Sequence, residues 1–236
     1  MKILDVKIDS LNFTEALKQA EVLITQKKPA YIVTLNPEII MAAQKDADLK
    51  RIINHADLVT PDGFGLMLMA RFLGQPLKER ITGVDLSWGL FKLAEDKGYR
   101  VFLLGGAAGV AKKASENIKR VHPRIKFVGI SSADPDGKGI IDTIGHAKPD
   151  ILFVAYGAPK QEKFISSLTS HISIPLSIGV GGTFDYIAEV HHYAPRWMRK
   201  LGLEWLYRLF TQPKRFNRII TATIRFPWSV LRSRFK

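Results

Sequence analysis

Short, almost wholly apolar segments alternate with helix-period segments along the first 190 residues, and this alternation constrains the fold more than any other feature. Segments that are apolar at every position are typical of parallel strands covered on both faces. The predicted strands are Ile3–Ile8, Tyr31–Leu35, Leu58–Thr60, Tyr99–Leu104, Lys126–Ile130, Ile151–Tyr156 and Pro175–Val180. The predicted helices are Thr14–Gln26, Pro37–Ala43, Asp46–His55, Gly65–Phe72, Asp85–Lys97, Val110–Val121 and Lys160–Leu168. We therefore expect an α/β fold with a Rossmann-like, mostly parallel sheet and helices on both faces.

The pattern changes after Ala194, where only helical segments follow and positive charge accumulates. Residues 191–236 contain eleven Lys and Arg residues and a single acid, Glu204, whereas the first 190 residues carry a net charge of only +3. We expect two parts: an α/β domain over residues 1–193 and a basic amphipathic helical appendage over residues 194–236. Such concentrated charge predicts an anionic partner, which is a nucleic acid, a phospholipid membrane or a phosphorylated substrate.

The segment after Pro213 has the spacing of an amphipathic helix. Its apolar positions recur at intervals of three and four residues: Phe216, Ile219, Ile220, Thr223 and Ile224. Pro227 is expected to kink or end this helix. A basic helix with an aromatic-rich apolar face suits an anionic membrane surface, but a terminal helix docked on its own domain shows the same pattern. Both interpretations stay open at this point.

Composition excludes several kinds of site. The chain has no cysteine, which removes disulfide bonds, thiolate metal sites and cysteine nucleophiles. Asp5 interrupts the stretch that a signal peptide would need to be apolar, so we expect no export. The longest uncharged run, residues 164–184, contains Pro175 and three glycines and is predicted to be helix, loop and strand rather than a membrane span. Asp46-Ala47-Asp48 and Asp134-Pro135-Asp136 have the spacing of metal ligands, but a helix cap and a turn explain them better, and we expect no metal and no cofactor.

Polar or glycine-rich segments follow five of the predicted strands. The carboxyl ends of parallel strands meet at one edge of a sheet, which is where such folds bind their ligands. The candidates at these ends are Thr34, Asn36, Asp62, Gly105, Gly106, Gln161 and Asp185. Asp62 stands between a strand and a glycine, where a carboxylate can act as a general base. Each residue alone could be a helix cap or a packing residue, but five such ends together favour a binding site.

Gly105-Gly106-Ala107-Ala108-Gly109 is similar to the phosphate-binding turn of dinucleotide enzymes. The acid expected after the next strand is missing, because Lys126–Ile130 is followed by Ser131-Ser132. This departure disfavours a nicotinamide cofactor, and it leaves a nucleotide phosphate or close packing as the reason for the glycines.

Five segments, in order along nearly the whole chain, together resemble the WecG/TagA/CpsF glycosyltransferases, glycosyltransferase family 26. They are Thr34-Leu35-Asn36-Pro37-Glu38, Pro61-Asp62-Gly63-Phe64-Gly65, Arg80-Ile81-Thr82-Gly83-Val84-Asp85-Leu86, Gly157-Ala158-Pro159-Lys160-Gln161-Glu162 and Gly202-Leu203-Glu204-Trp205-Leu206-Tyr207-Arg208-Leu209. The resemblance implies an inverting, metal-independent transfer of a sugar, typically N-acetylmannosamine or its uronic acid, from UDP to undecaprenyl-diphosphate-linked GlcNAc. It places such an enzyme in the cytoplasm, peripheral on the inner face of the plasma membrane, in the synthesis of teichoic acids or other surface polysaccharides.

The resemblance also implies roles for individual residues. Asp62 would be the general base, and Thr34, Asn36 and Gln161 would position the donor and acceptor. Arg80 would stabilise the leaving diphosphate and Asp185 would hold the ribose. The three arginines that match the family in the appendage, also called the tail here, are Arg208, Arg215 and Arg218, and they would close over the site and bind the diphosphate.

The implied partners are a UDP-sugar, a lipid-diphosphate-linked acceptor and an anionic membrane surface contacted by the appendage, without nucleic acid and with a homo-oligomer possible.

The chain departs from the family pattern at Phe164, Glu189 and Tyr193, two of which border the expected nucleotide site, so the donor sugar is the least defined part. Two other classes share some of these features: a nucleic-acid-binding α/β protein has a basic tail, and a Rossmann-type oxidoreductase has the glycine-rich turn.

Overall fold

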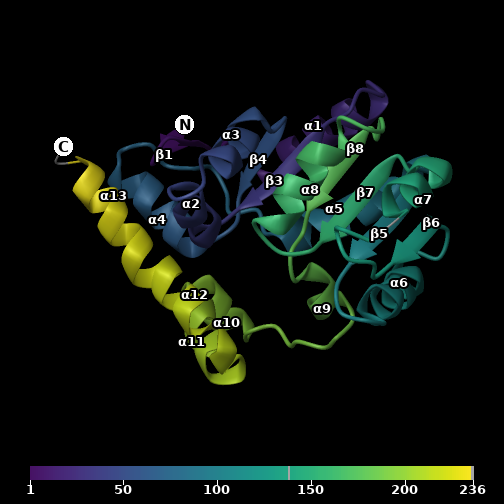
Figure 1. The fold of residues 1–236 in the computed structure, drawn as a ribbon. Coiled ribbons are helices and arrows are strands. Elements are labelled where there is room, and N and C mark those ends of the chain that lie inside the picture. The colour runs from purple at the N-terminus through teal and green to yellow at the C-terminus, as the bar shows by residue number, and fades with distance from the viewer. Residues whose placement is uncertain (138, 235–236) are drawn as a thin grey trace.

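The computed structural model describes residues 1–137 and 139–234, and it confirms the α/β class. A six-stranded sheet forms the centre of the molecule (Figure 1), with the strand order β4-β3-β8-β7-β5-β6 and every neighbouring pair parallel. The strands are β3 (Tyr31–Leu35), β4 (Leu58–Pro61), β5 (Arg100–Gly105), β6 (Lys126–Ser131), β7 (Ile151–Ala155) and β8 (Leu176–Gly179). Six of the seven predicted strands are therefore confirmed.

The prediction of a strand over Ile3–Ile8 is wrong. This segment is a hairpin, in which β1 (Lys2–Ile3) pairs antiparallel with β2 (Val6–Lys7). Leu4 and Asp5 have positive φ angles of 51° and 63°, and they form a tight turn that the apolar pattern gives no sign of. The buried side chains of the hairpin pack beside α2 and α3 instead of joining the sheet.

Helices cover both faces of the sheet, as the strand composition predicts. The helices of the α/β domain, called the body below, are α1 (Phe13–Thr25), α2 (Pro37–Ala43), α3 (Ala47–His55), α4 (Phe64–Phe72), α5 (Gly83–Lys97), α6 (Val110–Val121), α7 (Ile140–Ala147), α8 (Lys160–Leu168) and α9 (Thr183–Ile187). Val101 and Leu103 of β5 pack with α1, α5, α6 and α9, whereas the alternate residues Phe102 and Leu104 pack with α7 and α8. Two short helices, α7 and α9, were not predicted; α9 has only five residues, too few to show a helical period.

In the described residues after Ala194, helices and helical turns are the regular elements, as predicted. They are α10 (Arg196–Lys200), α11 (Glu204–Thr211), a 3₁₀ turn (Pro213–Arg215), α12 (Phe216–Ile220), a π-helical turn (Thr221–Arg225) and α13 (Phe226–Arg234). The helix does not end at Pro227, and a wider turn precedes the proline: the N–H of Phe226 donates to the carbonyl of Thr221, five residues earlier. This π-helical turn changes which carbonyls accept from the backbone N–H groups of the helix, just before Pro227, which has no N–H to donate.

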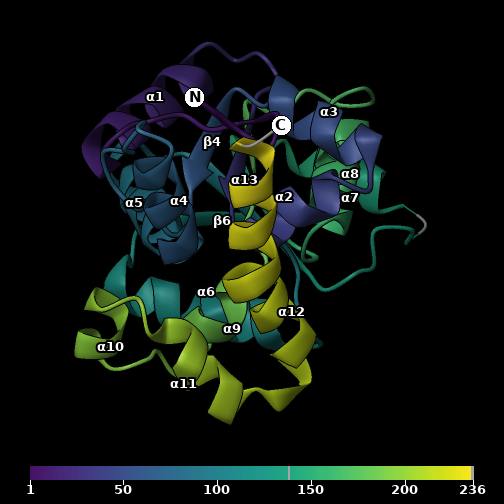
Figure 2. The ribbon, with the colours of Figure 1, turned by 90° about the vertical axis from the view of Figure 1, so that its left-hand side faces the viewer.

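The C-terminal helix docks on its own domain, which is one of the two interpretations that the sequence left open. Phe226 and Val230 are fully buried in a cluster with side chains of α2 and α4, and Figure 2 shows α13 running beside both helices. Ile224 and Trp228, on the outer side, are 62% and 67% exposed. Within the described part of the chain, no helix is long and apolar enough to cross a membrane. Residues 235–236 of the predicted appendage lie outside the described residues.

Candidate active site

The parallel sheet brings the five candidate strand ends to one edge, because every strand runs in the same direction. The helices of the appendage, α10 to α12, lie across this edge (Figure 1). Arginines of the appendage therefore meet loops of the α/β domain, including residues as far away along the chain as Glu38, which pairs with Arg218.

Asp62 follows β4 directly and contacts the start of α5. Its Oδ2 accepts a hydrogen bond from the backbone N–H of Gly83 at 3.0 Å. Burial raises the pKa of Asp62 to about 6, although this hydrogen bond and the positive charges of Arg80 and Arg208 favour the ionised form; the negative charge of Glu204 raises the pKa further. A carboxylate with a pKa near the working pH has the property that a general base needs.

Thr34 and Asn36 lie at the end of β3, next to this carboxylate loop. The hydroxyl of Thr34 is buried and donates to the carbonyl of Gly179 on β8 at 2.9 Å, so it joins two strand ends. The Oδ1 of Asn36 accepts from the N–H of Ile39 at 3.0 Å and caps α2, as the alternative explanation anticipated. Both side chains thus fix the backbone around the site.

Gln161 joins the loops after β7 and β8. Its Oε1 accepts from the N–H groups of Gly157 at 3.1 Å and Gly181 at 2.9 Å, and its Nε2 donates to Glu162 at 2.8 Å. A Cβ on Gly179 would lie only 2.7 Å from that Nε2, so the side chain can cross β8 only where glycine stands. Gln161 is 2% exposed, and its amide holds the two loops in register.

The glycine-rich turn after β5 is closely packed. Gly105 has a φ of +95°, and a Cβ there would lie 2.9 Å from the Tyr156 ring and 3.0 Å from the Ala155 carbonyl. The N–H of Gly106 donates to the same carbonyl at 3.1 Å. Close packing of β5 against β7, one of the two reasons that the sequence left open, therefore accounts for Gly105.

Asp185 lies in α9, beside the turn after β8. A Cβ built on Gly182 would lie 3.4 Å from the Asp185 carboxylate and 3.5 Å from an Arg215 guanidinium nitrogen, so both groups border the same glycine. Arg215 thereby reaches from the appendage to the edge of the sheet.

The tail arginines gather at this edge. Burial lowers the pKa of Arg215, and the positive charges of Arg218 and Arg208 lower it further, as expected where like charges are brought together. Arg218 donates to Glu38 in the first turn of α2 at 2.5 Å. Arg208 donates to Glu204, whose other oxygen lies 3.5 Å from Arg80.

Two partners of these arginines were not among the predicted site residues. Glu204 has a signal that could have identified it, because it is the single acid of the tail and precedes Arg208 by four residues, the spacing of a helical ion pair. Tyr186 has no comparable signal. Its ring lies under the Arg208 guanidinium at 5.6 Å and stacks on Tyr193 at 4.9 Å, so it lines the site together with a residue that departs from the family pattern.

Among the aspartates with metal-ligand spacing, Asp46 has a structural role, and Asp134 begins a turn in which its carbonyl accepts from the N–H of Gly137 at 2.9 Å. Asp46 caps α3, where it accepts from the N–H of Leu49 at 3.0 Å, and it forms an ion pair with Lys163 at 2.6 Å. Among residues 1–137 and 139–234, no three His, Asp or Glu side chains converge as ligands of a metal ion would. Metal independence itself stays a prediction.

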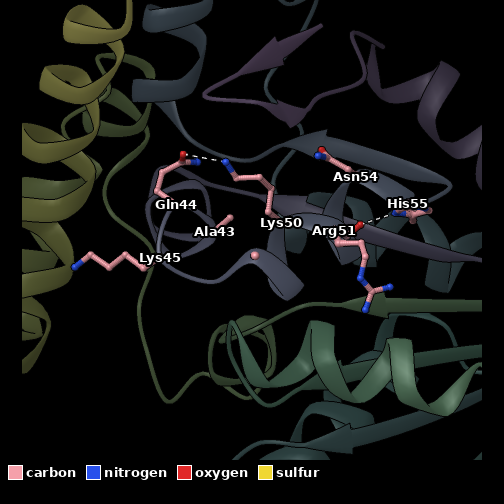
Figure 3. Close-up of a pocket in the computed structure, with 8 residues that line it drawn as sticks. Ala43, Gln44, Lys45, Lys50, Arg51, Asn54 and His55 are labelled. Atoms are coloured by element: carbon pink, nitrogen blue, oxygen red, sulfur yellow. Dashed lines mark hydrogen bonds between the residues drawn. The ribbon is translucent and has the colours of Figure 1, made fainter.

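A pocket of about 510 Å³ lies outside this site, along α2 and α3. Figure 3 shows its lining side chains, of which Lys45 and Arg51 extend in opposite directions rather than toward a common point. Lys50 there forms a hydrogen bond with Gln44, and Asn54 contacts the N-terminal hairpin. None of the predicted site residues lines this pocket.

The fold is of the α/β class, and it gathers the candidate site residues and the arginines of the appendage at the carboxyl ends of its strands. The model of the WecG/TagA/CpsF glycosyl transferase family matches residues 1–236, and the chain belongs to this family. It is therefore a glycosyltransferase, which agrees with the main interpretation of the sequence and not with a nucleic-acid-binding protein or an oxidoreductase.

Several curated proteins resemble the chain over most of its length. Proteins of Bacillus subtilis (strain 168) and Bacillus spizizenii are 38% and 36% identical to it over 199 residues, which cover 84% of this chain and 78% and 77% of theirs. A protein of Staphylococcus aureus (strain NCTC 8325) is 30% identical over 237 residues, covering 99% of this chain and 93% of its own. Each of the three is named an N-acetylglucosaminyldiphosphoundecaprenol N-acetyl-beta-D-mannosaminyltransferase.

Proposed function

We propose that this protein transfers N-acetylmannosamine from UDP to the GlcNAc of an undecaprenyl-diphosphate-linked acceptor, with inversion at the anomeric carbon. The names of the relatives supply the acceptor and the sugar. The observation that carries the mechanism is the position of Asp62, a carboxylate with a raised pKa after β4, held by the N–H of Gly83 and within the electrostatic influence of Arg80 and Arg208. The uronic acid of the same sugar is the second candidate for the donor.

In this mechanism Asp62 takes the proton from the acceptor hydroxyl as that oxygen attacks the anomeric carbon. The new bond forms on the face opposite UDP, the bond from the anomeric carbon to the phosphate oxygen breaks, and UDP leaves with the electron pair. A pKa of about 6 lets Asp62 be ionised at neutral pH while it remains a competent proton acceptor. A single displacement of this kind gives the inverted, β-linked product.

Negative charge develops on the diphosphate as UDP leaves. Arg208, Arg215 and Arg218 from the appendage and Arg80 from the body supply positive charge at this edge. Arginine suits a diphosphate because its planar fork donates two parallel hydrogen bonds. Fixed cationic donors can stabilise this charge, so we expect turnover without a divalent metal ion.

The acceptor is a lipid, and we propose that the protein meets it on the anionic, cytoplasmic face of the membrane. Exposed aromatic and aliphatic side chains support this proposal: Trp197, Leu201, Phe210, Phe216, Ile224 and Trp228 in the appendage, and Phe64, Leu68 and Phe72 on α4. The two groups adjoin, since Arg234 of α13 lies over the Phe72 ring at 5.0 Å and donates to its carbonyl. Apolar side chains beside exposed arginines are typical of surfaces that bind anionic lipid.

The experiment that tests the function combines the purified protein with UDP-N-acetylmannosamine and a soluble lipid-diphosphate-GlcNAc analogue. We expect release of UDP and formation of a β-linked disaccharide, both with excess EDTA present. No UDP release with this donor, but release with the uronic acid, would change the assigned sugar. A loss of turnover in EDTA that Mg²⁺ or Mn²⁺ restores would contradict metal independence.

A further inference from the structure

Glu204 stands out as a carboxylate in a segment of concentrated positive charge. It is the single acid of residues 191–236, and it occupies the first turn of α11, where the helix N-terminus favours a negative charge. One of its oxygens accepts from Arg208 and the other lies 3.5 Å from Arg80. Its side chain is 25% exposed, so this contact is partly removed from solvent.

The two arginines that Glu204 joins belong to different parts of the molecule. Arg80 precedes α5 in the body, and Arg208 comes from α11 in the appendage. The guanidinium of Arg208 also lies over the Tyr186 ring at 5.6 Å, so it is held from two sides. Each arginine uses one terminal nitrogen toward Glu204 and keeps further N–H groups for another anion.

Glu204 also acts on Asp62. The positive charges of Arg80 and Arg208 lower the pKa of Asp62, whereas the negative charge of Glu204 raises it. With Glu204 neutral, the two guanidinium groups would act on Asp62 without compensation, and Asp62 would become a weaker base.

We propose that Glu204 is a positioning residue of the transfer reaction: it holds Arg80 and Arg208 together across the body–appendage boundary and offsets their charge at Asp62. This inference rests on the proposed function. Substitution of Glu204 can separate its two effects, the hydrogen bonding that holds the arginines and the charge that acts on Asp62. The neutral Gln keeps one oxygen that can accept from the arginines but loses the charge, whereas Ala loses both.

The test compares Glu204→Gln, Glu204→Ala and Glu204→Asp in the full chain. For Glu204→Gln we expect UDP affinity, measured by calorimetry, to be equal or higher, because a like charge beside the diphosphate has been removed. The acid limb of its kcat/KM profile should move about one unit to lower pH, and kcat should fall about tenfold. Glu204→Ala should bind UDP more weakly and lose up to about 10²-fold in kcat/KM. In Glu204→Asp the acid limb of the kcat/KM profile should stay at the same pH as in the wild-type protein.

Glu38→Gln is the matched control, because Glu38 also pairs with an arginine of the appendage, Arg218, but is not among the charged groups that shift the pKa of Asp62. Its acid limb should stay in place. An unmoved acid limb in Glu204→Gln, with UDP affinity reduced in parallel with thermal stability, would leave Glu204 a merely structural residue and overturn the inference.

A failure of the proposed function can be distinguished from a failure of the inference on Glu204. If the original protein binds UDP but transfers no sugar, the assigned reaction is wrong, and the UDP affinities alone decide the role of Glu204. Unchanged or tighter binding by Glu204→Gln together with weaker binding by Glu204→Ala then supports positioning of the arginines, and weaker binding by both overturns it.

Discussion

The Oδ2 of Asp62 accepts a hydrogen bond from the backbone N–H of Gly83 at 3.0 Å, which joins the loop after β4 to the first residue of α5. The amide oxygen of an asparagine can accept the same bond, whereas the amide cannot take a proton from a hydroxyl at neutral pH. Replacement of Asp62 by asparagine therefore separates its structural role, accepting from Gly83, from its chemical role, taking a proton.

We expect Asp62→Asn to keep the fold and UDP binding but to lower turnover by about 10²-fold or more, as for the loss of a general base. Steady-state UDP release, thermal unfolding and UDP calorimetry on the same preparation measure the three properties. Turnover close to that of the original protein would remove Asp62 from this role.

The pKa of Asp62 predicts opposite pH dependences of activity and stability. The base works when ionised, so kcat/KM should rise with pH through about 6 and then level off. The folded pKa is above the ordinary value of 3.8, so the stability that protonated Asp62 contributes is present below pH 4 and is lost as pH rises through 6. The loss is at most about 3 kcal/mol. Asp62→Asn should avoid it and be the more stable protein at pH 8, which denaturant unfolding measures; an equal loss in both proteins would contradict the assignment.

Arg215 borders Gly182 and Asp185, so its loss should affect the donor site. We expect Arg215→Ala to lower kcat/KM for the UDP-sugar by about 10²-fold, and Arg215→Lys to recover only part of it, since lysine has no planar fork. Arg225→Ala is the control, because Arg225 is exposed on the π-helical turn that follows α12. Equal effects of the alanine variants would mean that charge at any position of the tail suffices.

Membrane binding should depend on the outward side of the C-terminal helix. We expect Ile224→Ser with Trp228→Ser to lose binding to vesicles that contain anionic phospholipid, measured by flotation, without loss of thermal stability. Ile219 is unsuitable for this test, since it is only 8% exposed and serine there would disturb packing. Val121→Ser on α6 is the control, because Val121 is 60% exposed but lies outside the proposed surface. Equal binding by the double variant and the control would refute the surface.

Glu162 should make stability pH-dependent near neutrality. It is 1% exposed, its Oε2 has no hydrogen-bond partner among the described residues, and burial raises its pKa to about 7. Because this folded pKa is raised, the stability of the protonated form is lost as pH rises through 7. Glu162→Gln should therefore be more stable at pH 9 by about 3 kcal/mol, and the gain should fall below about 1 kcal/mol at pH 5. A gain that is the same at both values would point to packing rather than charge.

Local pattern was sufficient for most elements of the body. Tyr31–Leu35, Pro37–Ala43 and Val110–Val121 have the bounds that the sequence predicts, because strand and helix periods are properties of neighbouring residues. The position of Asp62 after β4 follows from the same pattern. The hairpin at β1 and β2 was not predicted in this way: Asp5 is a residue type common in turns, but Leu4, the other residue with a positive φ, is not.

The sequence by itself determined the parallel sheet, the edge at which its polar strand ends meet, and the charge of the tail. Only the tertiary structure decided which side of the C-terminal helix is buried, because the partners of Phe226 lie in α2 and α4, far away in the chain. It also decided that the Gln161 amide serves two glycine N–H groups and that Glu204 lies between Arg80 and Arg208. Hydrogen bonds and ion pairs depend on distances in space, and a pattern of residue types carries no information on distance until the chain has folded.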